Sequence, residues 1–449
     1  MTKQIKKLPA LILMMAFVAM TMSGCTTYNN FKNAFLSDGN VETEKTIKIG
    51  VYEPMSGSMK KDAYEEIKGI ELAHSIRPEA CGKKIELIYG DNKSDMYAAD
   101  DVINEMLNKS SPSIILGSYG ETLTLVASKP IKATNTPAIT ISSTNPLITS
   151  NNEYYFCASY SETKQGDVLA DYAVNQAKVN TVATVTLGRD DTTVATLKRF
   201  TNKVKSLTEN DKSVAGTFPL PTDTQDYSQT IELIRASGAK AVFLAVSPDL
   251  AKSFLEQCVD KNLTHPIFLG TRDWNDEDFV NFVKSQPKIE VAFISEVNAT
   301  AESAKTKEFN RAYKAMYGED SKPSQACAIA YDAYMIAVQA LEDANKTIFT
   351  TTMDEVGKDA PTDAEALVAK KIWKEAYDSG IPAGQYIKDA LYNITDYEGA
   401  SGTINFGGSN EVSKEVSIIR INEGAEVAPY NVDKDVADGN EVEDTIKIG

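Results

Sequence analysis

The sequence predicts an α/β fold with parallel sheets, arranged as two similar lobes. Short apolar segments alternate with amphipathic helical segments along most of the chain. Two such series follow one another, and the second begins after residue 155. A strand–helix–strand unit places successive strands in parallel and covers both faces of the sheet with helices. The chain is also long enough, at 449 residues, for two or three domains.

The first series lies within residues 47–141. Residues 47–51 alternate apolar and polar side chains and lead into a loop with Pro54, which predicts a strand. Apolar residues recur at helical spacing over residues 62–77, and Pro78 ends that helix. The further elements predicted in this series are strands at 84–89, 113–116 and 138–141 and helices at 96–108 and 121–135.

The elements of the second series and of the C-terminal part are predicted from the same kinds of pattern. Helices are predicted at 165–177, 193–207, 226–237 and 249–261, and strands at 181–187, 214–218, 241–246 and 266–270. A long helical region at 301–344 comes next, then a less patterned stretch at 345–362 and helices at 363–379 and 384–392. Strands at 402–406 and 415–422 close the chain, with turn residues 407–410 between them.

The N-terminus predicts export. Three lysines and no acidic residue precede an apolar run at 8–20, which is typical of a secretory signal peptide and too short to span a membrane. Cys25 directly follows Ser23 and Gly24, and this resembles a bacterial lipobox, although Met22 stands where leucine is more common. We therefore expect a lipoprotein signal peptide at 1–24 and lipidation of Cys25. The alternative is an ordinary signal peptide with an incidental cysteine.

Residues 25–45 are polar and predict a tether between a lipid anchor and a folded body. A single acyl chain holds weakly, so stable attachment needs a second chain, which a diacylated cysteine supplies. The net charge of −17 argues against nucleic acid as a partner, because nucleic acid requires clustered Lys and Arg. We expect an extracytoplasmic protein attached to the cell membrane.

Four further cysteines, Cys81, Cys157, Cys258 and Cys327, match no metal-binding spacing. One or two disulfides are compatible with an exported protein, and buried free thiols are equally compatible. Separately, residues 438–449 repeat much of the sequence of residues 38–50 over about a dozen positions, which is too short for a structural repeat unit. We have no physical account of this repeat.

Ligands of open parallel sheets bind beyond the carboxyl ends of the strands. Two such loops, 117–122 and 142–146, are rich in Ser, Thr and Gly, and the first opens a helix. Hydroxyls and backbone N–H groups at a helix start suit a small anion such as a carboxylate. Plain N-capping is the commoner use of such residues and is the alternative here.

A series of motifs in order resembles the leucine/isoleucine/valine-binding protein family, the solute-binding components of ABC importers. The segments that carry the resemblance are Ile49-Gly50-Val51, Met55-Ser56-Gly57, Lys68 to Ala73, Ile115-Leu116-Gly117, Thr136 to Thr140, Thr144-Asn145-Pro146, Gln165-Gly166, Thr222 to Tyr227, Ala330 to Ala333 and Tyr397 to Phe406. The resemblance extends from Thr46 to about Asn422. No single segment is decisive, but their order and spacing together are specific.

The resemblance implies a type I periplasmic-binding fold, in which two Rossmann-like lobes with parallel sheets are joined by a three-crossover hinge and close on a ligand. On this basis we expect lobe one at 46–160 and 298–395, lobe two at 161–297 and 396–430, and a C-terminal tail at 431–449. It also implies an amino-acid-like ligand, an ABC permease with its ATPase as partners, a monomer and no cofactor.

The resemblance further implies site residues. In the family, loops of lobe one hold the ligand's α-carboxylate, and by position Thr122, Thr144 and the main chain around Ser142 would do so here. An acidic residue of lobe two takes the α-ammonium, and Asp273 is the matching position, with a solvated acidic loop as the alternative. Two aromatic residues, Trp274 and Tyr119, would wall the side-chain pocket, and Tyr160 would lie in a hinge-side loop.

The chain departs from the family pattern in ways that affect specificity. Gly120 and Glu121 replace serines after the third strand, and Glu121 would repel an anionic ligand. Asp62 stands where an aromatic residue is common, and the segment 189–192 replaces a Tyr-Gly pair with charged residues. A branched-chain amino acid is therefore only one candidate ligand.

An enzyme and a surface sensor are the two alternative classes of function. An enzyme is disfavoured because His74 and His265 lie outside the strand-end loops, and no nucleophile elbow, HExxH or P-loop motif is present. A surface sensor with the same fold is not distinguished from a transport protein by the sequence, since both depend on closure that ligand binding stabilises.

Overall fold

The computed structural model describes residues 46–187, 191–297, 303–360 and 362–431. The predicted signal peptide, Cys25, the tether, residues 188–190 and the C-terminal repeat at 438–449 lie outside the described residues. Within the described part, none of the helices combines the length and apolar character needed to cross a membrane. The four described cysteines are free thiols.

The first sheet has the strand order β2-β3-β1-β4-β5-β6. Its strands are β1 (Ile47–Glu53), β2 (Glu79–Ala80), β3 (Lys83–Asp91), β4 (Ile114–Leu116), β5 (Ala138–Thr140) and β6 (Tyr155–Cys157). All neighbouring pairs are parallel except β2 with β3. The carboxyl ends of β1, β3, β4, β5 and β6 therefore meet at one edge of this sheet.

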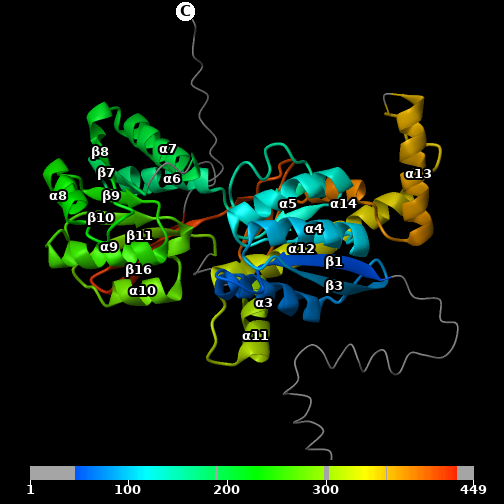
Figure 1. Cartoon of the computed structure of the whole chain (residues 1–449), viewed down its shortest axis with the longest axis horizontal. Helices are drawn as coiled ribbons and strands as arrows, with labels where there is room; N and C mark the ends of the chain where they lie inside the picture. The colour runs from blue at the N-terminus through cyan, green and yellow to red at the C-terminus, as the bar shows by residue number, and fades with distance from the viewer. Residues whose placement is uncertain (1–45, 188–190, 298–302, 361, 432–449) are drawn as a thin grey trace, which may run out of the picture. The chain divides into compact units, whose positions relative to one another are not determined.

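Helices cover both faces of the first sheet, as its apolar strands require. Ile47, Ile49 and Val51 of β1 pack in a core with α3 (Lys60–Ile76), α12 (Gln325–Thr350) and α14 (Gly384–Tyr392). Tyr52 and Ile115 face the other way and pack with α4 (Met96–Glu105) and α5 (Glu121–Thr134). A π-helical turn (Met106–Ser110) extends α4, and in Figure 1 α4 and α5 lie on the side of β1 opposite α3.

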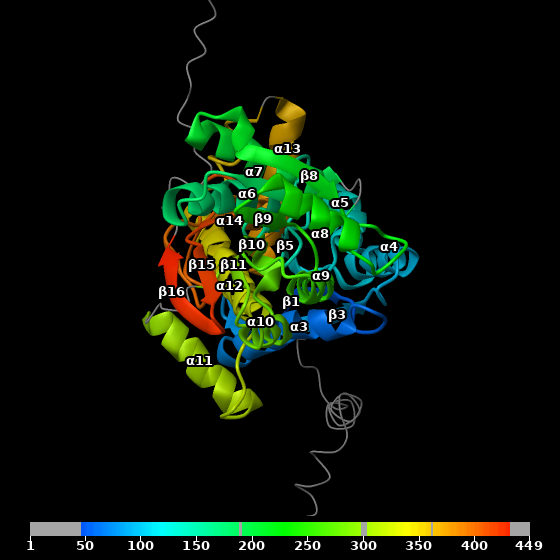
Figure 2. The ribbon, with the colours of Figure 1, turned by 90° about the vertical axis from the view of Figure 1, so that its left-hand side faces the viewer.

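The second sheet has the order β16-β15-β11-β10-β9-β7-β8. It contains β7 (Val182–Thr186), β8 (Val214–Pro219), β9 (Ala241–Leu244), β10 (Ile267–Gly270), β11 (Glu290–Ser295), β15 (Ser417–Asn422) and β16 (Ala425–Asn431). The strands β7 to β11 are parallel, whereas β15 pairs antiparallel with β11, and β16 pairs antiparallel with β15 at the edge of the sheet (Figure 2). The sequence predicted these strands except β11 and the separate strand β16.

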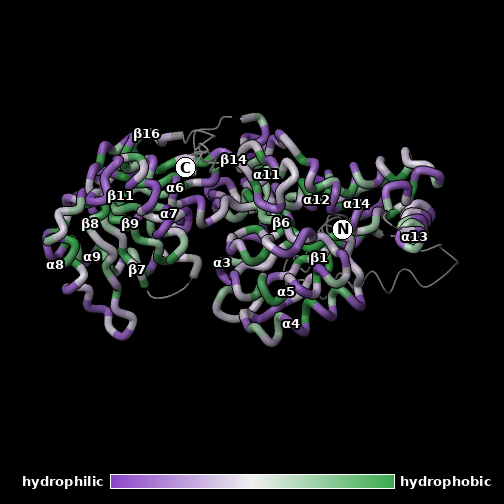
Figure 3. Tube along the Cα trace, turned by 90° about the horizontal axis from the view of Figure 1, so that it is seen from above, coloured by the Kyte–Doolittle hydropathy of each residue, from purple (hydrophilic) through white to green (hydrophobic). Residues whose placement is uncertain are grey.

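Two cores cover the second sheet. The helices α8 (Ser228–Ser237), α9 (Pro248–Asp260) and α10 (Glu277–Lys284) pack on one face, and α6 (Glu162–Asp171) with α7 (Asp191–Thr208) packs on the other. In Figure 1, α9 and α10 lie below the sheet and α6 and α7 lie above it. Figure 3 shows hydrophobic residues gathered along the strands, while helices such as α4 and α13 carry many hydrophilic residues.

The C-terminal half is divided more finely than the sequence indicated. The predicted helical region 301–344 is two helices, α11 (Ala304–Tyr317) and α12, because Gly318 and Pro323 fall between them. The helix α13 (Asp363–Ser379) packs against the end of α12 through Trp373 and Ile348.

A small third sheet follows. It is built from β12 (Tyr397–Glu398), β13 (Thr403–Asn405) and β14 (Ser413–Lys414). Its Ile404 packs in the first sheet's core, although the sequence had assigned 396–430 as a whole to the second lobe.

The chain passes three times between the two large sheets: after β6, after β11 and after β14. This confirms the predicted α/β fold with two parallel-sheet lobes and three crossovers. The individual lobe boundaries stay a prediction.

Candidate functional site

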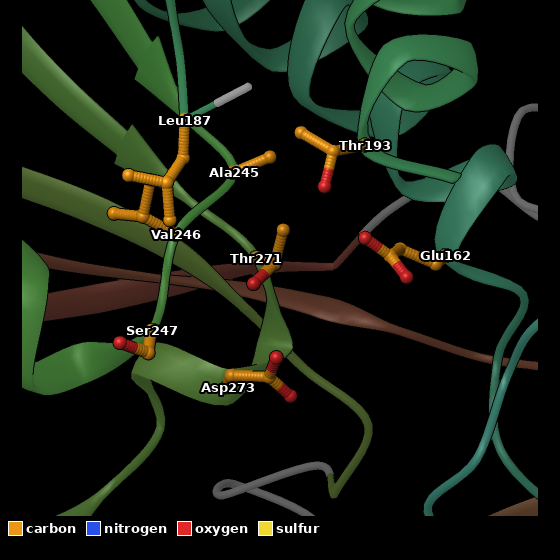
Figure 4. Close-up of a pocket in the computed structure, with 8 residues that line it drawn as sticks. All are labelled: Glu162, Leu187, Thr193, Ala245, Val246, Ser247, Thr271 and Asp273. Atoms are coloured by element: carbon orange, nitrogen blue, oxygen red, sulfur yellow. The ribbon is translucent and has the colours of Figure 1, made fainter. Parts of the chain in front are cut away.

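A cavity of about 310 Å³ lies at the carboxyl edge of the second sheet. Its lining residues either follow a strand or begin a helix: Glu162, Leu187, Thr193, Ala245, Val246, Ser247, Thr271 and Asp273. In Figure 4 the side chains of Thr193, Thr271, Glu162, Ser247 and Asp273 surround the same space. The topology brings them together because β7, β9 and β10 are parallel neighbours whose carboxyl ends meet at this edge.

The lining of this cavity is acidic and rich in hydroxyls. Thr193, Ser247 and Thr271 contribute hydroxyl groups, and Glu162 and Asp273 contribute carboxylates, while the described residues that line the cavity include no Lys, Arg or His. Hydroxyls can donate or accept, but ionised carboxylates only accept. The arrangement therefore favours a small ligand that carries hydrogen-bond donors such as an ammonium group.

Arg272 and Asp273 are adjacent in a short 3-10 turn (Arg272–Trp274) yet lie in opposite environments. The side chain of Asp273 is 63% exposed and lines the cavity, whereas that of Arg272 is 7% exposed. Their closest charged atoms, Arg272 Nε and Asp273 Oδ1, are 3.8 Å apart. The sequence identified Asp273 as the candidate for the ligand's ammonium group and overlooked Arg272.

The Arg272 guanidinium is held by a dense set of acceptors. Nη1 donates to Ser159 Oγ and to Glu296 Oε1, both at 2.6 Å, and Nη2 donates to the carbonyl of Ser142. The backbone N–H of Arg272 donates to Gln165 Oε1 at 2.9 Å. Arg272 thus joins the turn after β10 to the loops after β5 and β6, and Ser142, a predicted site residue, takes part through its main chain.

Trp274 belongs to the core beneath the cavity. The side chain is fully buried, its Nε1 donates to the carbonyl of Val246 at 2.9 Å, and its ring lies 4.9 Å from that of Phe279. A Cβ on Gly270 would lie 2.0 Å from the indole, so only glycine leaves room for this ring. Trp274 is not a lining residue, but it supports Val246, which is one. The sequence had placed it in the pocket wall.

Tyr119 lies at the carboxyl edge of the first sheet, after β4. Its backbone N–H donates to Glu53 Oε2 at 2.7 Å, and its hydroxyl donates to Asp62 Oδ2 at 3.4 Å. Burial raises the pKa of Tyr119, and the nearby carboxylates of Asp62, Asp273 and Glu66 raise it further. Tyr119 is therefore a neutral hydroxyl among carboxylates contributed by both lobes.

The two predicted threonines differ in position. Thr122 is exposed on the first turn of α5, and Thr144 is buried, with 7% exposure. A hydroxyl cluster that the sequence did not indicate lies beside them: Thr124 Oγ1 and Ser143 Oγ are 2.8 Å apart, and both bond to the carbonyl of Ser118. This cluster holds the loops after β4 and β5 together, which accounts for part of the Ser and Thr content of both loops.

Two buried glutamates also lie at this edge. Glu53 ends β1 and Glu66 lies on the inner face of α3, and both have no exposed surface. Burial, followed by the charge of Glu66, raises the pKa of Glu53 well above its ordinary value, and burial raises the pKa of Glu66 to about 7. The sequence held a signal for Glu66, because it shares the helical face of Ala63, Ile67 and Ile70.

Further buried charged side chains lie near the segments where the chain crosses between the two large sheets. The backbone N–H of Tyr160 donates to Glu296 Oε2 at 2.8 Å, and its ring is fully buried in the core of the second lobe. Tyr160 lies between β6 and α6, where the chain first crosses between the sheets, and its role as a hinge-side site residue stays a prediction. Lys414 Nζ lies 3.7 Å from Glu296 Oε2, and burial lowers the pKa of Lys414. Among the described residues, no group of His, Cys, Asp and Glu has the arrangement of a metal site.

A family model described as periplasmic binding protein matches residues 46–426 of the chain. A curated relative, an amino acid binding protein of Pseudomonas aeruginosa, is 27% identical over 235 residues. That alignment covers 48% of this chain and 58% of the relative, so the chain spans little more than half of the relative's length.

Solved structures share the fold. A leucine binding protein from Thermotoga maritima has a TM-score of 0.69 at 20% identity, covering 87% of this chain and 99% of that protein. A branched-chain amino acid transporter substrate binding protein from Streptococcus pneumoniae, solved with isoleucine, has a TM-score of 0.66 at 23% identity, with coverage of 86% and 99%.

The ligands of structures with this fold extend beyond amino acids. An ABC transporter solute binding protein from Rhodopseudomonas palustris, solved with 3,4-dihydroxybenzoic acid, has a TM-score of 0.66 at 19% identity, with coverage of 87% of this chain and 98% of that protein. At these identities the likeness shows the fold and leaves the ligand open.

Proposed function

The chain belongs to the periplasmic binding protein family, and from that premise we propose that it is a lipid-anchored solute-binding protein of an ABC importer that captures an amino-acid-like molecule. As a member of this family it is an extracytoplasmic ligand-binding protein and not an enzyme. The ligand, the lipid anchor and the transport partners are the parts of this statement that we propose.

The cavity at the edge of the second sheet carries the proposal for the ligand. Its volume of about 310 Å³ suits a molecule of amino-acid size, and its polar groups are hydroxyls and carboxylates. Asp273 stands at the position that the family resemblance assigns to the ligand's ammonium group, and its exposed carboxylate lines the cavity. A charge-assisted hydrogen bond from an ammonium group to this carboxylate is strong and directional.

The proposal for the anchor rests on sequence. Cys25 follows Ser23 and Gly24 after an apolar run, and lipidation of this residue would attach the body to the membrane through the polar segment 26–45. The substitution Cys25→Ala should move the protein from the membrane fraction to the soluble fraction and abolish labelling by a fatty-acid probe. Unchanged labelling would remove the anchor from the proposal.

Capture of the ligand and its delivery to a permease require a conformational change that ligand binding stabilises. An ABC permease and its ATPase are the partners that would receive the ligand, and a monomer suffices for this role. Stimulation of the ATPase by the ligand-loaded protein, compared with the ligand-free protein, measures the coupling. A signalling partner in place of a permease would show binding without such stimulation.

The ligand is tested by a thermal-shift screen of the purified protein against amino acids, diamines, aromatic carboxylates and sugars. A ligand at 100 times its Kd adds about 2.7 kcal/mol to the free energy of unfolding, which is a readily measured shift. Asp273→Asn should abolish the shift caused by an amine-bearing ligand. Glu277→Gln, which removes an exposed carboxylate four residues further on, is the matched control and should keep it.

A shift produced only by sugars or by carboxylates without an amine would contradict the proposed ligand class. A thermal shift that persists in the Asp273→Asn variant would show that the ligand's ammonium group binds elsewhere in the protein.

A further inference from the structure

The buried carboxylate of Glu296 contacts all three segments in which the chain crosses between the two large sheets. Glu296 directly follows β11, at the second crossover, and its side chain has no exposed surface. Its Oε2 accepts the backbone N–H of Tyr160 in the first crossover at 2.8 Å and lies 3.7 Å from Nζ of Lys414, where the third crossover begins. Three segments that lie far apart in the sequence therefore meet at one side chain.

The other oxygen of Glu296 is connected to the candidate site. Oε1 accepts a hydrogen bond from Arg272 Nη1 at 2.6 Å. Arg272 directly precedes Asp273, which lines the cavity, and Arg272 Nη2 donates to the carbonyl of Ser142 in the loop after β5. Through one guanidinium, Glu296 is thus linked to the turn after β10 and to the loop after β5.

The charged side chains around Glu296 depend on one another. Two cations, Arg272 and Lys414, contact its carboxylate, and all three side chains are buried. Lys414 also donates to Ser401 Oγ at 3.0 Å, and Ser401 Oγ donates to Asp332 of α12 at 2.6 Å. A buried charge that loses its partner is costly, so the crossovers cannot move apart from one another without a large loss of free energy.

We propose that Glu296 is the positioning residue of the hinge, which holds the three crossovers as one unit and fixes the turn of Asp273 through Arg272. Closure of two lobes requires a few connecting segments to absorb changes in backbone dihedral angles. Because the crossovers are tied together at Glu296, they turn together, and the loops of the two lobes meet in one arrangement. This inference goes beyond the proposed function, because it does not depend on which ligand binds.

Hydrogen–deuterium exchange of the purified protein, measured peptide by peptide without added ligand, tests this role. The variant Glu296→Gln keeps the size of the side chain, but its amide has one acceptor oxygen and one NH2 group in place of two acceptor oxygens. The NH2 group would face a donor, either Arg272 or the backbone N–H of Tyr160, so the contacts cannot all form. Local opening that follows from this loss increases amide exchange.

We expect exchange in Glu296→Gln to become at least about tenfold faster, which corresponds to the loss of one hydrogen bond to a charged group. Peptides from β4 and β9, inside the two sheets, should keep their exchange rates. The segments that should exchange faster together are the three crossovers at 158–161, 294–297 and 412–416 and the turn at 271–275.

Two further variants make the result interpretable. Ile234→Ala is the control, because Ile234 is buried in the core of the second sheet on α8, a helix that contributes no lining residue of the cavity and no crossover residue. It shows the exchange that results from lower stability alone. The double variant Glu296→Gln/Lys414→Met leaves one buried cation fewer without a partner, so it replaces the single variant if that variant does not fold, and it should show the same pattern.

Faster exchange at all three crossovers and at the turn, with the sheet interiors unchanged, is the result that the hinge unit predicts. Unchanged exchange, or an increase confined to the segment around Glu296, would overturn the proposal, because Glu296 would then form only a local ion pair. An increase throughout both lobes in proportion to lost stability, as in Ile234→Ala, would also overturn it. None of these outcomes bears on the ligand class, so the proposed function is tested separately.

Discussion

Arg272 Nη1 and Glu296 Oε1 lie 2.6 Å apart, and both side chains are buried. The pair links the turn after β10 to the end of β11, while the same guanidinium reaches Ser159 and Ser142 in the loops of the first sheet. A buried ion pair is costly to break, because removal of one partner leaves the other charge without compensation. Arg272 therefore fixes the crossover region next to the candidate site.

Replacement of Arg272 tests this relationship. Arg272→Met should lower the free energy of unfolding by about 3–5 kcal/mol, because Glu296 would keep only the more distant Lys414 as a charged partner. Urea denaturation measures the loss. The control Lys284→Met breaks the half-exposed pair with Glu426 and should cost less than about 1 kcal/mol. Equal losses in the two variants would show that burial of the Arg272 pair has no special effect.

The pKa of Glu66 predicts an unusual dependence of stability on pH. Its pKa rises from an ordinary value of 4.5 to about 7 in the folded protein. Between these values the folded state binds more protons than the unfolded state, so Glu66 makes the protein less stable as pH rises from about 4.5 to about 7. The charged or titratable groups that face it are Glu53, Arg272 and Tyr119.

Glu66→Gln should remove this dependence. The free energy of unfolding of the variant, relative to the original protein, should increase from pH 5 to pH 8 by on the order of 3 kcal/mol, since each pKa unit corresponds to about 1.4 kcal/mol. Groups that do not interact with Glu66 contribute equally to both proteins and cancel in the difference. The pKa of Glu53, which the charge of Glu66 raises, is lowered in the variant and adds to the difference. Parallel stability curves for the two proteins would contradict the raised pKa.

The effect of substituting Trp274 distinguishes a role in the core of the second sheet from a role in the wall of the ligand pocket. Trp274→Ala should lower the free energy of unfolding by about 3–5 kcal/mol, because a fully buried ring is removed from the core of the second sheet. Tyr97→Ala, at a residue that is 77% exposed, is the control and should change stability by less than about 0.5 kcal/mol. A Trp274→Ala variant with unchanged stability and altered ligand affinity would instead show that Trp274 lines the ligand pocket.

Substitution of Gly117 tests whether the Glu53 carboxylate packs closely against this position. Gly117 and Gly82 both have positive φ, at 108° and 68°, but only at Gly117 would a Cβ meet neighbouring atoms, namely the carbonyl of Tyr52 and the Glu53 carboxylate. Gly82→Ala should cost about 1–2 kcal/mol from backbone strain alone. Gly117→Ala should cost clearly more, as measured by thermal or urea unfolding, and similar losses would contradict the close packing of Glu53.

Local patterns were sufficient to predict most of the helices and strands in their order, but not β6, α10, β11 or β16. The apolar alternation at 47–51 and the turn at Pro78 lie within one segment, so the sequence reports them directly. The strand β11 was missed although its residues 291–294 are apolar and follow the helix α10, whose start at Asp276 has an N-capping side chain. Asp273 was proposed as a site residue because it lies in a strand-end loop at a position that the family resemblance marks, and in the structure its exposed carboxylate lines the cavity.

The residues that the sequence missed depend on contacts between distant segments. Arg272 looks like one charge in an acidic loop until the loops after β5 and β6 place Ser142 and Ser159 against it. Glu53 and Glu66 look like ordinary acids until the sheet buries the end of β1 against α3. The burial of Trp274 was not foreseen, because neighbouring side chains in a short turn point to different sides and the sequence does not say which side is the core.

The most direct test of the central claim is to identify the small molecule that the protein retains when it is purified from its host. The protein is purified without added ligand and unfolded, and the released molecules are identified by mass spectrometry and titrated back into refolded protein and into Asp273→Asn. The account predicts a small amine whose binding is lost in Asp273→Asn. A released and rebinding ligand without an amine, such as an aromatic carboxylate or a sugar, would contradict it.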